Sequence, residues 1–167
     1  MIAMRLPNRK LLMIVADGVD QLECDQLRIG FEDEGARVLA ATPGEYISIE
    51  TVAGNRQGKD ILIDIPFETI ILERFDGLII PDGLLSSAAF SDNDEIIDLV
   101  QRFHEYGLPI FASGRAVEVL YRSRVLSQCV LVREGEPIGT FVDQAVQILQ
   151  DASERYLAPR KTPALGT

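Results

Sequence analysis

Residues 112–114, with the sequence Ala-Ser-Gly, resemble in type a nucleophile turn, because they follow an apolar segment and precede a helical one. A serine nucleophile needs a base within hydrogen-bond reach, and the chain contains one histidine, His104. We expect His104 on the preceding helix, at the opposite end of the sheet. Ser113 also lies one position before Gly114, the residue at the turn itself, so its side chain is expected to point elsewhere. A serine hydrolase is the less favoured interpretation.

Two cysteines, Cys24 and Cys129, could carry thiol or metal chemistry. They lie far apart in sequence and in no metal-ligand spacing, so we predict reduced thiols and no metal site. Cys24 falls in the first turn of a predicted helix beside Glu23, where the helix dipole lowers a thiol pKa and the carboxylate raises it. We favour an inert, partly buried thiol at Cys24, with a reactive thiol as the alternative, and place Cys129 in the core.

The elements that must position these side chains are predicted from apolar runs and their period. Continuous apolar runs predict buried parallel strands over residues 9–16, 36–42, 76–81 and 108–112. Amphipathic spacing predicts helices over 20–34 and 92–105, after Gly114, and over 141–157. Asp20 is expected to cap the first helix and Gly35 to end it. This alternation predicts an α/β fold, a three-layer α/β/α sandwich with a mainly parallel sheet.

Two antiparallel additions to that sheet are also predicted. Segments 46–52 and 60–65 alternate around a glycine-containing stretch, which predicts a peripheral hairpin at a sheet edge. Segments 129–133 and 136–140 flank Glu134-Gly135 and predict a second pair. Ligands of such sandwiches bind at the carboxyl ends of the strands, so function is sought there.

The length of 167 residues favours one domain. We assign residues 9–157 to it, 1–8 to an N-terminal extension, and 158–167, with two prolines and no periodicity, to a flexible tail. The net charge of −10 disfavours nucleic-acid binding. The apolar run 11–16 is too short to span a membrane and lacks a signal-peptide layout, so we expect no membrane partner and a cytoplasmic location.

Four segments, in chain order, carry a more specific pattern: LLMIVADGVDQLE (11–23), ETVAGNRQGKDILID (50–64), FDGLIIPDG (75–83) and GLPIFASGRAVEVL (107–120). Together they resemble the ThiJ/PfpI family of the class I glutamine amidotransferase-like fold, and the third segment is the most specific. The resemblance spans roughly residues 10–150 and implies a flavodoxin-like sandwich. Known members include intracellular proteases, glyoxalases, chaperones and deglycase-like proteins.

The same resemblance predicts that the family's reactive groups are replaced. The ungapped alignment puts Gly114 at the reactive cysteine and Arg115 at the histidine that follows it. In protease-like members a carboxylate from the loop after Pro-Gly-Gly assists, and the matching residue is Ser87. The segment after Leu126 is also shorter than usual. These replacements therefore argue against every inherited activity, although they leave the predicted fold unaffected.

The remaining candidate pocket comprises the family-equivalent positions Glu23, Asp82, Gly83, Ser113, Gly114 and Arg115. Gly114 preserves an elbow conformation without a side chain, either for the turn alone or as an empty anion or ligand pocket. Asp82 replaces the first glycine of the family's Pro-Gly-Gly. We expect the Arg115 guanidinium to pair with Glu23 or with Asp82.

We therefore expect a non-catalytic ThiJ/PfpI-like protein without a cofactor. Its role would be as a homo-oligomer, as a binder of a small molecule or anion, or as an interaction module. The alternative is a protease, amidase, glyoxalase or deglycase-like enzyme with a rebuilt site. A receiver-like signalling module is a second alternative, but its strand ends would need an aspartate and a lysine where this chain has Pro81 and Ser113.

Overall fold

The structure is a computed structural model that describes residues 3–83, 92–125 and 130–156, with side chains described through residue 152. Its central sheet has five strands in the order β10-β9-β8-β1-β3, and every pairing within it is parallel. The strands are β1 (Lys10–Ile14), β3 (Arg37–Ala41), β8 (Gly77–Ile80), β9 (Ile110–Ser113) and β10 (Val130–Arg133). The predicted parallel sheet is confirmed.

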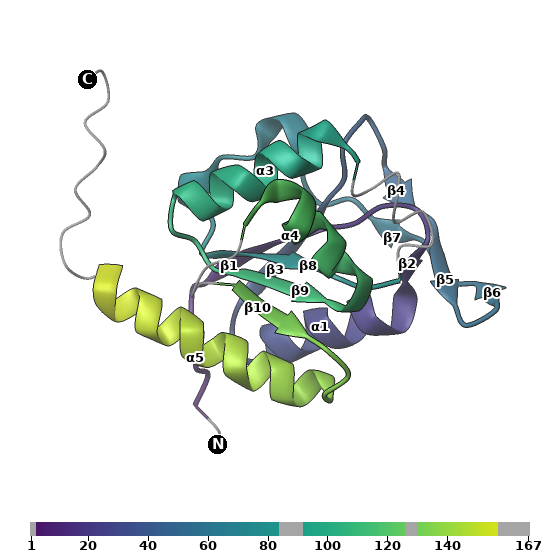
Figure 1. The fold of residues 1–167 in the computed structure, drawn as a ribbon. Coiled ribbons are helices and arrows are strands. Elements are labelled where there is room, and N and C mark those ends of the chain that lie inside the picture. The colour runs from purple at the N-terminus through teal and green to yellow at the C-terminus, as the bar shows by residue number, and fades with distance from the viewer. Residues whose placement is uncertain (1–2, 84–91, 126–129, 157–167) are drawn as a thin grey trace.

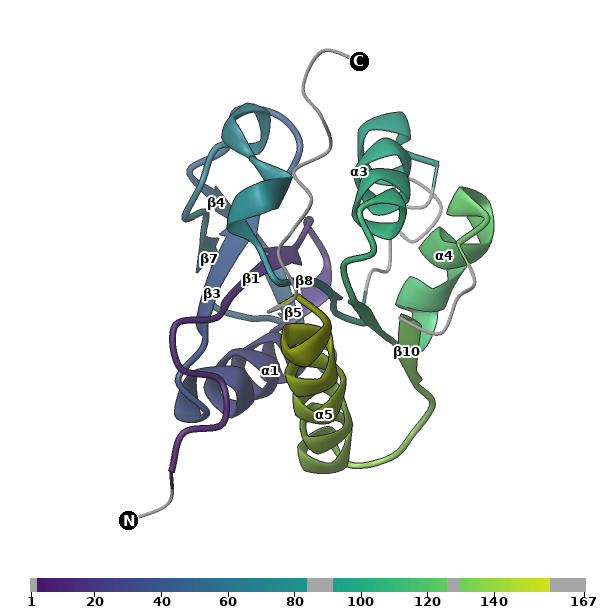
Figure 2. The same cartoon turned by 90° about the vertical axis from the view of Figure 1, so that its left-hand side faces the viewer.

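Helices cover both faces of this sheet (Figure 1). They are α1 (Gln21–Asp33), α3 (Asp94–Glu105), α4 (Val117–Ser123) and α5 (Ile138–Tyr156), with short 3-10 turns η1 (Phe67–Thr69), η2 (Leu72–Arg74) and η3 (Gly114–Ala116). Helices α1 and α5 lie together on one face, and α3 and α4 lie on the other (Figure 2). The predicted α/β/α sandwich is confirmed.

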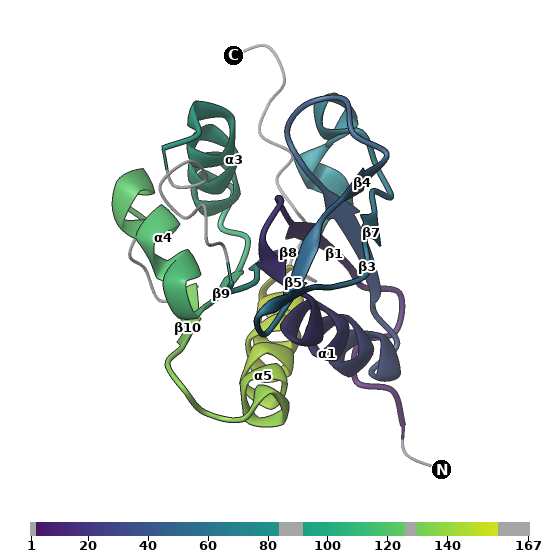
Figure 3. The ribbon, with the colours of Figure 1, turned by 90° about the vertical axis from the view of Figure 1, so that its right-hand side faces the viewer.

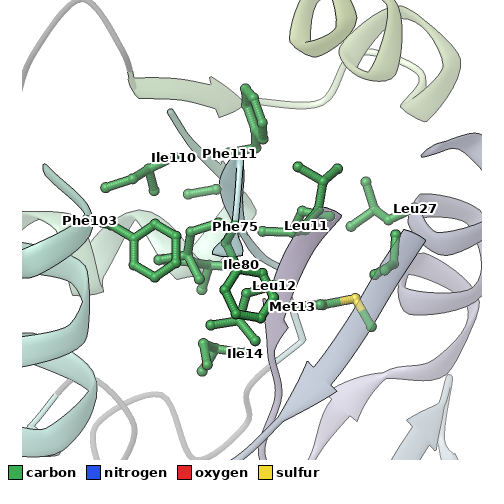
Figure 4. Close-up of a cluster of buried hydrophobic side chains, with 14 of the residues drawn as sticks. Leu11, Leu12, Met13, Ile14, Leu27, Phe75, Ile80, Phe103, Ile110 and Phe111 are labelled. Carbon is green, nitrogen blue, oxygen red and sulfur yellow. The ribbon is translucent and has the colours of Figure 1, made fainter. Parts of the chain in front are cut away.

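The core forms because the central strands are apolar on both sides. Leu11, Leu12 and Met13 of β1 are fully buried, so an unbroken apolar run is what this position requires. Figure 4 shows these side chains among those of β8, β9 and α3. The rings of Phe31 and Phe111 stack with their centroids 6.0 Å apart, which joins α1 to β9.

The predicted peripheral hairpin is present as two short ladders, of which the one formed by β4 (Ser48–Ile49) and β7 (Ile61–Leu62) lies near the edge strand β3 (Figure 3). Strands β4 and β7 pair antiparallel, and so do β5 (Thr51–Ala53) and β6 (Arg56–Gln57). Strand β5 also runs parallel to β2 (Val19–Asp20). The Asp64 amide donates to the Ala40 carbonyl at 2.9 Å, so this region lies along the edge of the main sheet.

The second predicted antiparallel pair is wrong. Strand β10 pairs in parallel with β9, and residues 136–140 form no strand, because α5 begins at Ile138. Pro137 explains the difference: its fixed φ suits a helix start, and its carbonyl accepts from the Phe141 amide at 3.2 Å. The helix predicted from residue 141 thus starts three residues earlier, at residue 138.

Residues just before β1 pack against the helical layer of α1 and α5. Leu6 is fully buried, and the Arg5 guanidinium donates to Glu34 and to Asp143, each at 2.6 Å. Residues 158–167, assigned to a tail, lie outside the described residues. Within the described part of the chain, no helix has the length and hydropathy needed to cross a membrane.

Two glycines in the α1/α5 layer make a matched test of this packing. A Cβ on Gly139 would meet nothing within 4 Å, whereas one on Gly30 would lie 2.9 Å from Cγ2 of Val142. We predict that Gly139→Ala raises the free energy of unfolding by about 0.5 kcal/mol through helix propensity. Gly30→Ala should fall about 1 kcal/mol below Gly139→Ala, because the buried valine must move. Urea denaturation compares them, and equal stabilities would contradict this account.

Candidate functional site

The site begins at the amino end of α1, which Asp20 caps as predicted. The Asp20 carboxylate accepts from the Glu23 amide at 2.9 Å and so fixes the first turn. This turn directs the Glu23 side chain inward, where it is 8% exposed. Its Oε1 accepts from the Asp82 amide at 3.3 Å. Glu23 therefore links α1 to the segment that follows β8.

Residues Asp82 and Gly83 cross directly over the start of α1. The Asp82 carbonyl accepts from the Asp20 amide at 3.2 Å. Gly83 has φ +91°, and a Cβ there would overlap the Asp20 backbone nitrogen and lie 2.9 Å from its Cα. A glycine is thus required at position 83 both by the backbone conformation and by this close approach.

The turn after β9 brings Gly114 under the Asp82 carboxylate. Gly114 has φ +55°, in the left-handed region. The Oδ1 of Asp82 accepts from the Arg115 amide at 2.9 Å and from the Gly83 amide at 2.7 Å. A Cβ on Gly114 would overlap Oδ2 and Cγ of Asp82. The carboxylate therefore occupies the space where any side chain at the turn would begin.

The opposite wall of the site is formed by Ser113 and Arg133. These residues are partners in the parallel register of β9 and β10. Ser113 is fully buried, and its Oγ accepts from Nη1 of Arg133 at 3.3 Å. The Arg133 Nε donates to the Glu136 carbonyl at 2.7 Å, which holds the guanidinium in place. The Ser113 hydroxyl also hydrogen-bonds to Glu23.

These contacts shift the charge state of Glu23. Burial raises the pKa of its carboxyl above the ordinary 4.5, and the nearby Asp82 charge raises it further. The hydrogen bonds from Ser113 and the Asp82 amide, and the charge of Arg133, oppose this rise without cancelling it. The site thus holds the Asp82 side chain beside a second carboxyl, that of Glu23, whose pKa is raised.

The structure brings together most of the predicted site residues. Glu23, Asp82, Gly83, Ser113 and Gly114 form one cluster at the carboxyl end of the sheet. The Ser113 side chain, expected to point elsewhere, lies inside this cluster. Ser87 and Cys129 fall outside the described residues.

The expected ion pair of Arg115 is wrong. Among the described residues its guanidinium, which belongs to an exposed side chain, pairs with neither Glu23 nor Asp82. The backbone amide makes the contact to Asp82 instead, because the turn of η3 points that N–H at the carboxylate. The side chain is left to face solvent.

Cys24, the other candidate nucleophile, and His104, the candidate base, are not positioned for catalysis in this cluster. Cys24 is 1% exposed within the core, and burial, followed by Glu23 and other acidic neighbours, raises the pKa of its thiol. His104 lies near the end of α3, which leads into the start of β9, whereas the cluster follows the carboxyl end of β9. No group of three or more metal-ligating side chains occurs among the described residues.

Sequence reasoning missed Arg133. It ends a predicted strand, and the carboxyl ends of parallel strands share one edge of a sheet. Because residues 129–133 were expected to pair antiparallel with 136–140, the sequence did not predict that Arg133 lies at this edge. The parallel register with β9 is what places Arg133 beside Ser113.

Comparison with known proteins supports the fold and identifies a matching family and a relative. The model of the DJ-1/PfpI family matches residues 9–131. Catalase HPII of Mycobacterium avium is 25% identical over 149 residues, which cover 89% of this chain and 20% of the catalase. The chain therefore spans about a fifth of the length of that relative.

Solved structures show the same fold. A two-domain protein of Anabaena variabilis, with DJ-1/ThiJ/PfpI-like and ferritin-like domains, gives a TM-score of 0.72 at 16% identity over 84% of this chain and 48% of its own. A ThiJ/PfpI domain protein of Brachyspira murdochii gives 0.72 at 15% identity, over 87% and 98%. DJ-1beta of Drosophila melanogaster gives 0.66 at 18% identity, over 89% and 97%.

The overlap at Gly114 predicts an unusually costly alanine substitution. Gly114→Ala should lower the free energy of unfolding by about 2 to 3 kcal/mol, through positive φ and through collision with Asp82. Gly135→Ala is the matched control, because Gly135 has φ +99° and open space around its Cβ position. It should cost only about 1 kcal/mol. Urea denaturation measures both, and equal costs would mean that Asp82 does not fill the turn.

The raised pKa of Glu23 predicts how stability varies with pH. Above the ordinary carboxyl pKa of 4.5, the folded chain retains a proton that the unfolded chain has lost. The stability that this retained proton contributes to the folded chain is full below pH 4.5, and it is lost as the pH rises through the pKa of Glu23 in the folded chain. Glu23→Gln should therefore gain stability relative to the native chain as pH increases. Urea denaturation across a pH series tests this, and a pH-independent difference would contradict it.

Proposed function

This chain belongs to the DJ-1/PfpI family, and we propose that it is a non-catalytic member that acts by binding. The alignment proposed from sequence puts Gly114 at the position of the family's reactive cysteine and Arg115 at that of the following histidine. A glycine carries no nucleophile, and the exposed guanidinium of an arginine does not act as a base near neutral pH.

The observation that carries this proposal is the position of the Asp82 carboxylate. It accepts from the amides of Gly83 and Arg115 and fills the space above Gly114. In an elbow, backbone N–H groups of this kind stabilise a thiolate or an oxyanion. Here a carboxylate that belongs to the chain itself takes both donors, and its negative charge would repel an anionic intermediate.

A role as an interaction module is the form of binding that we favour. Similarity to a catalase covers 20% of that protein, and the match to the Anabaena variabilis two-domain protein covers 48% of its chain. In both cases the region similar to this chain is part of a longer polypeptide. Homo-oligomer formation, recognition of a small molecule or anion, and a cytoplasmic location remain parts of the proposal, the last supported by the free thiol of Cys24.

The enzyme alternative rests on a different observation. Glu23 is a buried carboxyl with a raised pKa, hydrogen-bonded to the hydroxyl of Ser113, as a rebuilt protease, amidase or glyoxalase-like site would require. Ser113 is fully buried, however, so a substrate carbonyl does not reach it without rearrangement. The receiver-like alternative is disfavoured by the family match over residues 9–131.

Turnover measurements test the proposal directly. We predict no activity above blank for the native chain on peptide, methylglyoxal or glycated substrates. Activity that is lost in both Ser113→Ala and Glu23→Gln would overturn the proposal and favour the enzyme alternative.

Thiol reactivity tests the role of Asp82 in closing the turn. In Gly114→Cys the introduced thiol should react slowly with an alkylating reagent, because the Asp82 carboxylate crowds and repels a thiolate. The double variant Asp82→Gly/Gly114→Cys should react at least about tenfold faster. Peptide mass mapping separates this thiol from Cys24 and Cys129. Equal rates in the two variants would mean that Asp82 does not close the turn.

A further inference from the structure

Helices α1 and α5 lie side by side on the face of the sheet opposite α3 and α4 (Figures 2 and 3). An open groove lies between the two helices. The groove has a volume of about 660 Å³. Its lining comes from α1, from the amino-terminal part of α5 and from Arg133 before it. It is therefore separate from the space above Gly114.

The floor of the groove is formed by apolar side chains and glycines. Ile29 of α1 is 57% exposed there, and Val142 of α5 lies across from it. Gly30 lets the two helices approach, while the position of a Cβ on Gly139 is open space. Leu22, 64% exposed, lies two helical turns before Ile29 on the same side of α1, with Asp25 and Gln26 between them. Exposed aliphatic side chains beside a groove between two helices suit a third helix.

The rim of the groove is acidic. Asp33, Glu34 and Asp143 line it, and the guanidinium of Arg5 bridges only the last two. Asp33 is exposed and forms no ion pair among the described residues. Arg133, the cation of the lining, donates inward to Ser113 rather than outward. A positively charged occupant is thus complementary to this rim.

We propose that the α1/α5 groove docks a cationic amphipathic helix of a partner polypeptide. The helix would place aliphatic side chains on Ile29 and Val142 and lysine or arginine side chains against the acidic rim. A second copy of this chain fits less well, because each copy carries a net charge of −10. The inference deepens the proposed binding role and rests on it.

Peptide binding to the full chain tests this proposal. The probe is a fluorescent helical peptide of about 14 leucine and lysine residues with the leucines at i, i+3, i+4 and i+7 spacing. The comparison peptide has the same composition in an order that gives no apolar face. We expect fluorescence anisotropy to show at least about tenfold tighter binding of the amphipathic peptide. Equal affinities would overturn the proposal.

Two groove variants locate the binding. Gly139→Trp should fill the open floor and weaken binding at least about tenfold without changing the charge of the chain. Ile29→Lys should weaken it similarly, whereas Ile47→Lys, the same change at a side chain that is 85% exposed outside the groove, should stay within about twofold. Circular dichroism confirms folding, and Ile29→Lys, at an exposed position, carries the test if Gly139→Trp unfolds.

The outcomes separate this inference from its alternatives. Equal weakening by Ile29→Lys and Ile47→Lys would show attraction to the overall charge and overturn the groove. A dimer in sedimentation that Gly139→Trp dissociates would assign the groove to a second copy and likewise overturn the proposal. Binding is measured without turnover, so an active elbow would remove the non-catalytic proposal while leaving the peptide result intact.

Discussion

The Asp82 carboxylate, held above Gly114, fixes how the carboxyl ends of the strands meet. One of its oxygens accepts from the amides of Gly83 and Arg115, so a single side chain ties the segment after β8 to the turn after β9. The Asp82 backbone joins the same arrangement to α1, through its carbonyl to Asp20 and its amide to Glu23. The two hydrogen bonds to the Asp82 carboxylate are charge-assisted, which makes them stronger than hydrogen bonds between neutral groups. Gly83 and Gly114 both adopt positive φ, which lets the backbone segments approach each other so closely.

A carboxylate in this position has a consequence for its neighbour. Glu23 is buried beside it, and two ionised carboxyl groups that are close together and shielded from water would repel each other. Burial and this repulsion raise the pKa of Glu23, and the Ser113 hydroxyl and the Arg133 charge oppose part of that rise. The cluster is consequently a set of mutually satisfied polar groups, which favours a role in holding α1, β8, β9 and β10 together.

The sequence predicted those features that depend on local rules. The fully buried strand β1 follows from its apolar run, and the start and end of α1 follow from the Asp20 cap and the positive φ of Gly35. Features that depend on tertiary neighbours were missed. Whether Arg115 uses its guanidinium or its amide is decided by the orientation of the η3 turn, and the pairing of β10 is decided by its neighbour β9. Neither the contact of Arg115 nor the pairing of β10 can be predicted from the local sequence pattern.

Arg133 connects the elbow to the groove, although the two are separate spaces. Arg133 lines the groove between α1 and α5, and its guanidinium donates to Ser113, whose hydroxyl bonds to Glu23. The same positive charge lowers the pKa of Glu23 against the effect of burial. Removing this positive charge from the neighbourhood of Glu23 would therefore raise the pKa of Glu23 further. The charge balance of the cluster thus depends on a residue that also lines the groove.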